Sequence, residues 1–244
     1  MPPATWHMGN TRKTLVVDNS PLTLELMTDL LTEQGHQVLT AEDGVSALDI
    51  LHDYVPDVIF VDLIMPNIDG FRLCQIIRQI DLLKDCYLVI LSATAAEEEI
   101  DLALLGANEF IAKGRFSETA PYILAAIEHA ASATPRPLAQ KVIGLEHVYP
   151  REITRELLSS RKHFEIVLGR MSEGILEISS VARIVYANPA SIALVGIPEQ
   201  ALLGMSALEI FGSENRAMIE ALLPKNGIAP HSAADGAQIR LRDR

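Results

Sequence analysis

The chain lacks several features that would define other classes of protein. It has no apolar run of about 18 residues, the length a membrane-spanning helix needs, and its first ten residues, polar and rich in proline, do not form a secretory signal. It has two cysteines, Cys74 and Cys86, which lie in apolar segments without CxxC spacing. A disulfide framework or a cysteine metal site is therefore not expected. We expect a cytoplasmic protein with buried thiols and no membrane contact.

Basic residues are scarce in the first half. Residues 1–131 hold 7 Lys or Arg against 20 Asp or Glu, whereas residues 132–244 hold 13 against 12. Because phosphate contacts need a positive surface, this balance argues against direct nucleic-acid binding. The glycine-rich phosphate-binding motifs of nucleotide enzymes are also missing. The expected partners are proteins and cations.

What the first half does contain is an alternation of short β-branched runs and amphipathic segments. A parallel sheet covered on both faces explains strands that are apolar throughout. Right-handed crossovers then give an α/β fold, a (βα)5 doubly wound sheet of flavodoxin-like type, with its site at the carboxyl ends of the strands. The predicted strands are 14–18, 36–40, 57–62, 87–93 and 109–113, and the predicted helices are 21–35, 44–55, 70–80, 96–107 and 117–131.

Polar residues stand where four of these strands end. Asp18 and Asn19 follow the first strand, Asp62 ends the third, Ser92 the fourth and Lys113 the fifth. The carboxyl ends of parallel strands meet at one edge, so these side chains should converge. Carboxylate and amide oxygens suit Mg²⁺, and an ammonium with a hydroxyl suits a phosphoryl group. A carboxylate placed there can act as a nucleophile toward phosphorus.

Four segments carry a family resemblance: "VVDNSP" (16–21), "VDLIMPNIDG" (61–70), "ILSA" (90–93) and "FIAKG" (110–114). In this order and at these strand ends they resemble the receiver domain of bacterial response regulators, over residues 14–131. The resemblance implies that Asp62 accepts a phosphoryl group from a histidine kinase or phosphotransfer protein.

The same resemblance implies roles for the residues around Asp62. Ser92 and Lys113 would contact the phosphoryl group, and Ser92 and Phe110 would form the switch that responds to it. Mg²⁺ is expected on Asp18, Asn19, Asp62 and the backbone carbonyl of Ile64.

Two positions depart from the family pattern. Asn19 stands where the family has a second pocket acid, so we expect weaker Mg²⁺ binding. Gly114 replaces the proline that usually follows the lysine, so we expect a flexible turn after Lys113.

Competing functions follow from the same residues. A phosphatase with an aspartyl nucleophile needs an acid two residues after it, where Ile64 stands. A degenerate receiver that acts only in protein interaction and dimerisation stays open, as does the N-terminal part of a hybrid sensor histidine kinase. We expect a phosphoacceptor rather than an enzyme, with any enzymatic output outside this chain.

Residues 132–162 are predicted to be a linker with a signalling helix. Prolines dominate its first part, and an apolar stripe then appears at alternating spacings of four and three, interrupted by Ser160. Such a stripe is typical either of a helix packed on its own domain or of a parallel coiled coil, and we predict a homodimer through it. The stripe consists of Ile153, Leu157, Phe164, Val167 and Met171.

Residues 163–244 resemble the start of a PAS domain, with a predicted hairpin at 174–188 and short helices at 189–196 and 198–211. The pattern ends before at least one strand of the family's five-stranded antiparallel sheet, so this α+β domain is expected to be incomplete. No cysteine lies where covalent flavin chemistry needs one, and the ligand stays unknown. Residues 1–13 are predicted to be a leader.

Overall fold

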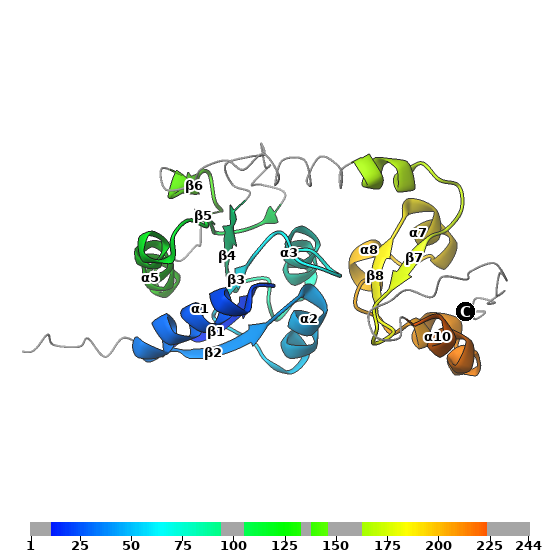
Figure 1. Cartoon of the computed structure of the whole chain (residues 1–244), viewed down its shortest axis with the longest axis horizontal. Helices are drawn as coiled ribbons and strands as arrows, with labels where there is room; N and C mark the ends of the chain where they lie inside the picture. Colours follow the sequence, from blue (N-terminus) through cyan, green and yellow to red (C-terminus); the bar gives the residue numbers. More distant parts are fainter. Residues whose placement is uncertain (1–10, 94–104, 133–137, 146–162, 224–244) are drawn as a thin grey trace, which may run out of the picture.

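The computed structural model describes residues 11–93, 105–132, 138–145 and 163–223. These residues form a six-stranded parallel sheet with helices on both faces and, following it in the chain, a small α/β part with a two-stranded antiparallel sheet (Figure 1). We call residues 11–145 the receiver half and residues 163–223 the C-terminal unit.

The parallel sheet has the order β2-β1-β3-β4-β5-β6. Its first five strands match the predicted pattern, and the order with β1 between β2 and β3 is that of a flavodoxin-like doubly wound fold. The predicted fold class of the first half is therefore confirmed. The strands are β1 (Lys13–Val17), β2 (Gln37–Ala41), β3 (Val58–Val61), β4 (Tyr87–Ser92), β5 (Glu109–Ala112) and β6 (Val142–Ile143).

Helices cover the sheet in two layers, α1 (Pro21–Glu33) and α5 (Phe116–Ser132) on one face and α2 (Gly44–Asp53) and α3 (Gly70–Gln79) on the other (Figure 1). Three of these helices begin at side-chain caps, since Ser20, Asp43 and Asp69 each accept a hydrogen bond from a first-turn amide. These caps fix where each helix leaves the carboxyl edge of the sheet.

The inner strands β1, β3, β4 and β5 are buried on both faces because apolar side chains alternate between two cores, whereas the edge strand β2 is mostly exposed. Val16, Phe60 and Leu91 pack with the residues of α1 and α5. Val17 and Ile90 pack on the opposite face with residues of α2 and α3. A strand that is apolar at every position is thus explained by two covered faces rather than by one.

Strand β6 is a difference from the sequence prediction. Residues 132–162 were expected to link two domains, yet Val142 and Ile143 pair in parallel with Phe110 and Ile111 of β5. Two residues are too short for a periodic pattern, which is why the sequence did not reveal them. The predicted helix at 96–107 lies mostly outside the described residues, as do Ile153 and Leu157 of the apolar stripe.

The C-terminal unit begins with a helix at 163–169 and continues with β7 (Leu176–Ile178) and β8 (Ile184–Ala187), which pair antiparallel as predicted. The predicted helix at 198–211 is instead two helices, because Gly204 between them has a φ of 82°. After the hairpin, the C-terminal unit contains the helices α7 (Pro189–Val195), α8 (Glu199–Leu202), α9 (Ala207–Phe211) and α10 (Arg216–Leu222), with a 3₁₀ turn at Ser213–Asn215.

The PAS-like identity of this unit stays a prediction. The antiparallel hairpin is present, but the segment predicted to carry a further strand, 234–244, lies outside the described residues. The helix that carries the predicted apolar stripe also ends earlier than expected, at residue 169, so Met171 lies outside it.

Two expectations drawn from what the sequence lacks concern membrane spans and cysteines. Among the described residues, none of the helices combines the length and apolar character needed to cross a membrane. Cys74 and Cys86 are both buried, as predicted. Burial raises the pKa of the Cys74 thiol to about 12, so it stays protonated at neutral pH.

Candidate functional site

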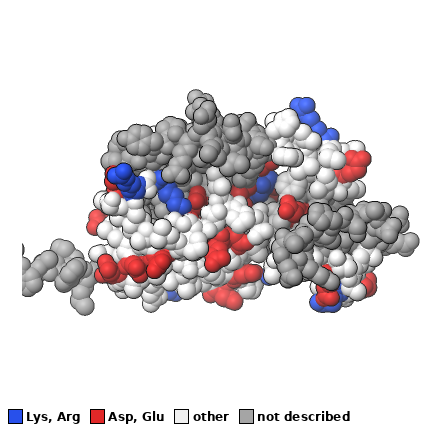
Figure 2. Space-filling model, in the orientation of Figure 1, with Lys and Arg blue, Asp and Glu red and all other residues white. Residues whose placement is uncertain are grey.

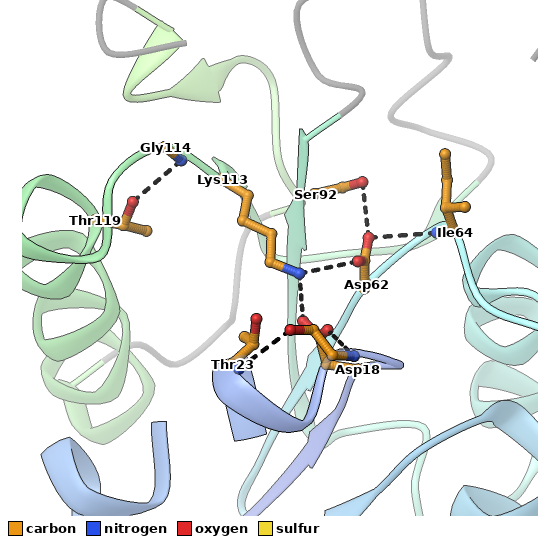
Figure 3. Close-up of polar contacts among 9 residues, drawn as sticks. Asp18, Thr23, Asp62, Ile64, Ser92, Lys113, Gly114 and Thr119 are labelled. Carbon is orange, nitrogen blue, oxygen red and sulfur yellow. Dashed lines mark hydrogen bonds and ion pairs between the residues drawn. The ribbon is translucent and has the colours of Figure 1, made fainter. Parts of the chain in front are cut away.

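Four of the predicted side chains meet at the carboxyl edge of the parallel sheet (Figure 3). Asp18 follows β1, Asp62 follows β3, Ser92 ends β4 and Lys113 follows β5. The first three are at least nine-tenths buried. Parallel register brings these strand ends to one level, so the geometry follows from the fold.

Asp62 is held at both carboxylate oxygens. Its Oδ1 accepts hydrogen bonds from Ser92 Oγ at 2.9 Å and from the Ile64 amide at 3.3 Å. Its Oδ2 accepts from Lys113 Nζ at 3.0 Å. The carboxylate is therefore oriented by a hydroxyl, an amide and an ammonium that come from three different strand ends.

Lys113 bridges the two aspartates, with Nζ 2.5 Å from Asp18 Oδ2 and 3.0 Å from Asp62 Oδ2. Burial alone would lower the pKa of Lys113, but the charges of Asp62 and Asp18 outweigh it and raise the pKa. Burial raises the pKa of Asp18, against the opposing effect of Lys113. The ammonium therefore stays charged and holds two carboxylates that would otherwise repel each other.

The donor set fits a hard divalent cation that keeps several waters. Two carboxylates share one ammonium, which leaves one negative charge in excess. Asn19 follows Asp18 directly in the chain and is exposed. Within the described part of the chain no group of three or more His, Cys, Asp or Glu side chains forms a closed metal site. Mg²⁺ commonly binds through one or two carboxylates plus water and phosphate, and this arrangement fits that mode.

The turn after Lys113, which the sequence predicts to be flexible, carries a hydrogen bond that the sequence did not predict. The Gly114 amide donates a hydrogen bond to Thr119 Oγ1 at 3.3 Å, and Thr119 Oγ1 donates to the Arg115 carbonyl at 3.1 Å. A proline has no amide hydrogen and could not make the first bond. The Gly114 amide therefore ties this turn to Thr119 of α5 (Figure 3). Thr119 was not among the predicted site residues, although its position in the first turn of α5 was an available signal.

The predicted switch aromatic is inside the core. Phe110 of β5 is fully buried and pairs with Ile90 of β4 and Val142 of β6. Ser92 lies two residues after Ile90 along β4. The hydroxyl and the aromatic ring therefore belong to neighbouring strands, and a movement at the end of β4 would act directly on the pairing of β5.

Charge on the surface agrees with the composition. Figure 2 shows many more acidic than basic side chains over the visible face of the receiver half. Sequence reasoning missed one basic side chain, Arg72 of α3, which contacts Glu199 although 127 residues separate them. A contact at such separation leaves no periodic or local signal in a single sequence.

Comparison with known proteins identifies the first half. Residues 14–120 match the model of the response regulator receiver domain. The sensor histidine kinase RcsC of Salmonella typhimurium is 42% identical over 85 residues, which cover 35% of this chain and 9% of the relative. The probable transcriptional regulator ycf27 of Guillardia theta is 35% identical over 104 residues, covering 41% of this chain and 39% of the relative. A receiver domain of two-component signalling at residues 14–120 is thus well supported.

Two solved structures are each similar to 48% of this chain. The chemotaxis response regulator CheY4 of Vibrio cholerae has 28% identity and a TM-score of 0.45, over 48% of this chain and 99% of its own. TrrA of Thermotoga maritima, solved in complex with Mg²⁺-BeF, has 30% identity and a TM-score of 0.42, over 48% of this chain and 99% of its own. The chain spans 9% to 39% of the length of the curated relatives named above.

Proposed function

We propose that this chain is a phosphorylation-controlled signalling module in which Asp62 accepts a phosphoryl group from a histidine kinase or phosphotransfer protein. The observation that carries the proposal is the binding of both Asp62 oxygens by Ser92, the Ile64 amide and Lys113. These donors lie where charge would develop on the transferred group, and a preorganised site of this kind lowers the barrier to transfer.

The residues of this chain would act as follows. An Asp62 oxygen forms a bond to phosphorus as the bond from phosphorus to the imidazole nitrogen of the donor breaks, and the bonding electron pair leaves with the imidazole. Lys113 and Ser92 donate to the phosphoryl oxygens. Because Ser92 already donates to Asp62, it changes acceptor without leaving the site. The chain would be a stoichiometric acceptor that catalyses its own modification, not an enzyme that turns over.

Asp18, Asn19, Asp62 and the Ile64 carbonyl would hold Mg²⁺. When bound, the cation supplies positive charge against the phosphoryl oxygens. One excess negative charge in the site and the exposed amide of Asn19 support this assignment.

Downstream roles extend the proposal. The C-terminal unit would be a PAS-like module that receives the change and relays it to an output outside this chain. Phe164 and Val167 of the predicted stripe are exposed on the helix at 163–169, which supports pairing with a second copy. The acidic receiver surface supports a protein partner rather than a nucleic acid.

Acetyl phosphate with Mg²⁺ tests the central claim. Intact-mass analysis should show one phosphoryl adduct on the wild-type chain and none on Asp62→Asn. Asp53→Asn is the matched control, because Asp53 is exposed at the end of α2 and the chemical change is the same. Equal labelling of wild type and Asp62→Asn would refute the site. A complete lack of labelling would favour the degenerate receiver that acts only through protein contacts.

A further inference from the structure

The C-terminal unit rests on one face of the receiver half, the face formed by α2 and α3 (Figure 1). Arg72 of α3 donates from Nε to Glu199 Oε1 of α8 at 3.0 Å, and its Nη1 lies 3.6 Å from Glu165 Oε1. Its guanidinium also lies 5.4 Å from the centroid of the Tyr186 ring in β8. One arginine of the receiver half therefore contacts three segments of the C-terminal unit.

A second contact joins α2 to the same unit. Arg183 donates to Asp49 Oδ1 at 2.9 Å and to the Gly204 carbonyl at 2.8 Å. A Cβ on Gly204 would come within 2.9 Å of Leu48 Cδ1, so the backbone there lies directly against α2. Buried apolar side chains of both parts belong to one continuous core, which makes the contact a packed interface and not only a pair of ion bridges.

The first residues of both helices pack against residues 63–69, the loop that follows Asp62. A Cβ on Gly70, the first residue of α3, would overlap the carbonyl oxygen of Asp62, and the Gly70 amide donates to the Leu63 carbonyl at 3.1 Å. Asp69 caps α3 and also accepts from Arg72 Nη1 at 2.8 Å. The start of α3 therefore lies directly against the backbone of Asp62, and Arg72 lies in its first turn.

The start of α2 is held by the same loop. A Cβ on Gly44 would overlap the carbonyl oxygen of Ile68, and the Asn67 side-chain amide donates to Asp43, the cap of α2. Asn67 has a φ of 61°, a conformation that few residues other than glycine adopt and that fixes the path of the loop. Close packing at both glycines means that a shift of the loop moves both helices.

We propose that the α2–α3 face is the docking surface for the C-terminal unit and that phosphorylation of Asp62 weakens this docking through residues 63–69. The proposal rests on the proposed function, since it needs Asp62 to be the acceptor. A phosphoryl group takes Lys113, Ser92 and the Ile64 amide away from the carboxylate. The loop then moves with the Ile64 backbone, and the ion contacts of Arg72 lengthen.

The charge of the contact suits such a release. The side chains of Arg72 and Glu199 are 20% and 28% exposed, so water reaches the pair as soon as it separates. Burial opposes the charge of Arg72, but Asp69, Glu199 and Glu165 outweigh it and raise the pKa. The guanidinium of Arg72 thus stays charged throughout the physiological pH range.

Hydrogen exchange on the full chain, with and without acetyl phosphate and Mg²⁺, tests the proposal. Exchange at residues 184–187 of β8 should become about tenfold faster on phosphorylation, as expected when a charge-assisted contact is lost. Glu199→Gln should show the faster exchange without the phosphodonor and gain little from it. Glu220→Gln is the matched control, because Glu220 pairs only loosely with Arg216 at 3.7 Å on the surface of α10, and it should behave as wild type.

Intact mass, measured on the same samples, separates the two proposals. If the adduct forms on Asp62 and exchange in β8 is unchanged or slower, the docking proposal is overturned and the proposed function stands. If no adduct forms, both fall. If Glu220→Gln releases β8 as much as Glu199→Gln does, the role given to the Arg72 contact is wrong.

Discussion

Two clusters in this molecule place one cationic side chain among carboxylates, and they use different cations. The lysine cluster consists of Lys113, Asp18 and Asp62, and the arginine cluster consists of Arg72, Asp69, Glu165 and Glu199. An ammonium is a compact charge on a flexible stem, whereas a guanidinium is a rigid planar fork. The first can exchange one acceptor for another during a reaction, and the second holds several partners in fixed directions. The difference indicates that the lysine cluster is a site of reaction and that the arginine cluster holds the receiver half and the C-terminal unit together.

Solvent exposure separates the two carboxylates that Lys113 bridges from the two that Arg72 contacts in the C-terminal unit. The side chains of Asp18 and Asp62 are 2% and 9% exposed, whereas those of Glu199 and Glu165 are 28% and 43% exposed. Buried charges interact strongly and resist screening by salt, while partly hydrated pairs are weak enough to open. A contact that must be released in signalling belongs in the second environment.

The largest effect should come from removing the cation of the lysine cluster. Lys113→Met keeps the length of the stem and removes the charge, so the initial rate of adduct formation from acetyl phosphate should fall about a hundredfold. Lys84→Met, at an exposed position, is the control and should keep the wild-type rate. Lys113→Arg should not restore the rate, because the planar fork does not take the place of the compact ammonium. Full activity of the arginine variant would break the distinction drawn between the clusters.

A smaller effect is expected on the proposed dimerisation through the helix that supplies Glu165 to the arginine cluster. The neighbouring side chain of Phe164 is 64% exposed. Replacing Phe164 by Glu should weaken a homodimer about thirtyfold, since burial of one large apolar side chain contributes about 1.5–3 kcal/mol. Light scattering over a concentration series measures this, with His163→Glu as the control on the same helix. An unchanged dimer would place the interface elsewhere.

The smallest effect should come from adding a carboxylate to the lysine cluster. Asn19→Asp should tighten Mg²⁺ binding about tenfold, because the affinity of such sites follows the number of charged ligands. Calorimetry is the suitable measurement, and Asp18→Asn should change the affinity in the opposite direction. If Asn19→Asp leaves the affinity unchanged, Asn19 is not a ligand.

The sequence predicted the lysine cluster and missed the arginine cluster, for a physical reason. Asp62, Ser92 and Lys113 each follow an apolar strand, and parallel pairing alone brings such positions together. Arg72 reaches Glu199 across two folded parts, and only packing between them sets that contact. Local patterns record the secondary structure that a segment adopts, and they do not record which faces of two folded parts meet.

The boundaries were predicted unevenly for a similar reason. The helices α1 and α3 begin at Pro21 and Gly70 as predicted, and the caps Ser20 and Asp69 that hold these starts are local features. The split of the helix predicted over 198–211 depends on Gly204, whose φ of 82° and close approach to Leu48 come from packing on α2. Glycine in a helical pattern is tolerated often enough that the sequence alone did not reveal the break.

Strand β6 has a consequence for how the first half can be handled in isolation. The family match ends at residue 120, and α5 ends at Ser132, yet the hydrogen-bonding edge of β5 is covered by Val142 and Ile143. A fragment cut at either point would expose that edge, and an exposed strand edge is a template for pairing with another chain. Aggregation of such a fragment would therefore reflect the choice of its end point. A fragment extended through Leu145 keeps the edge closed.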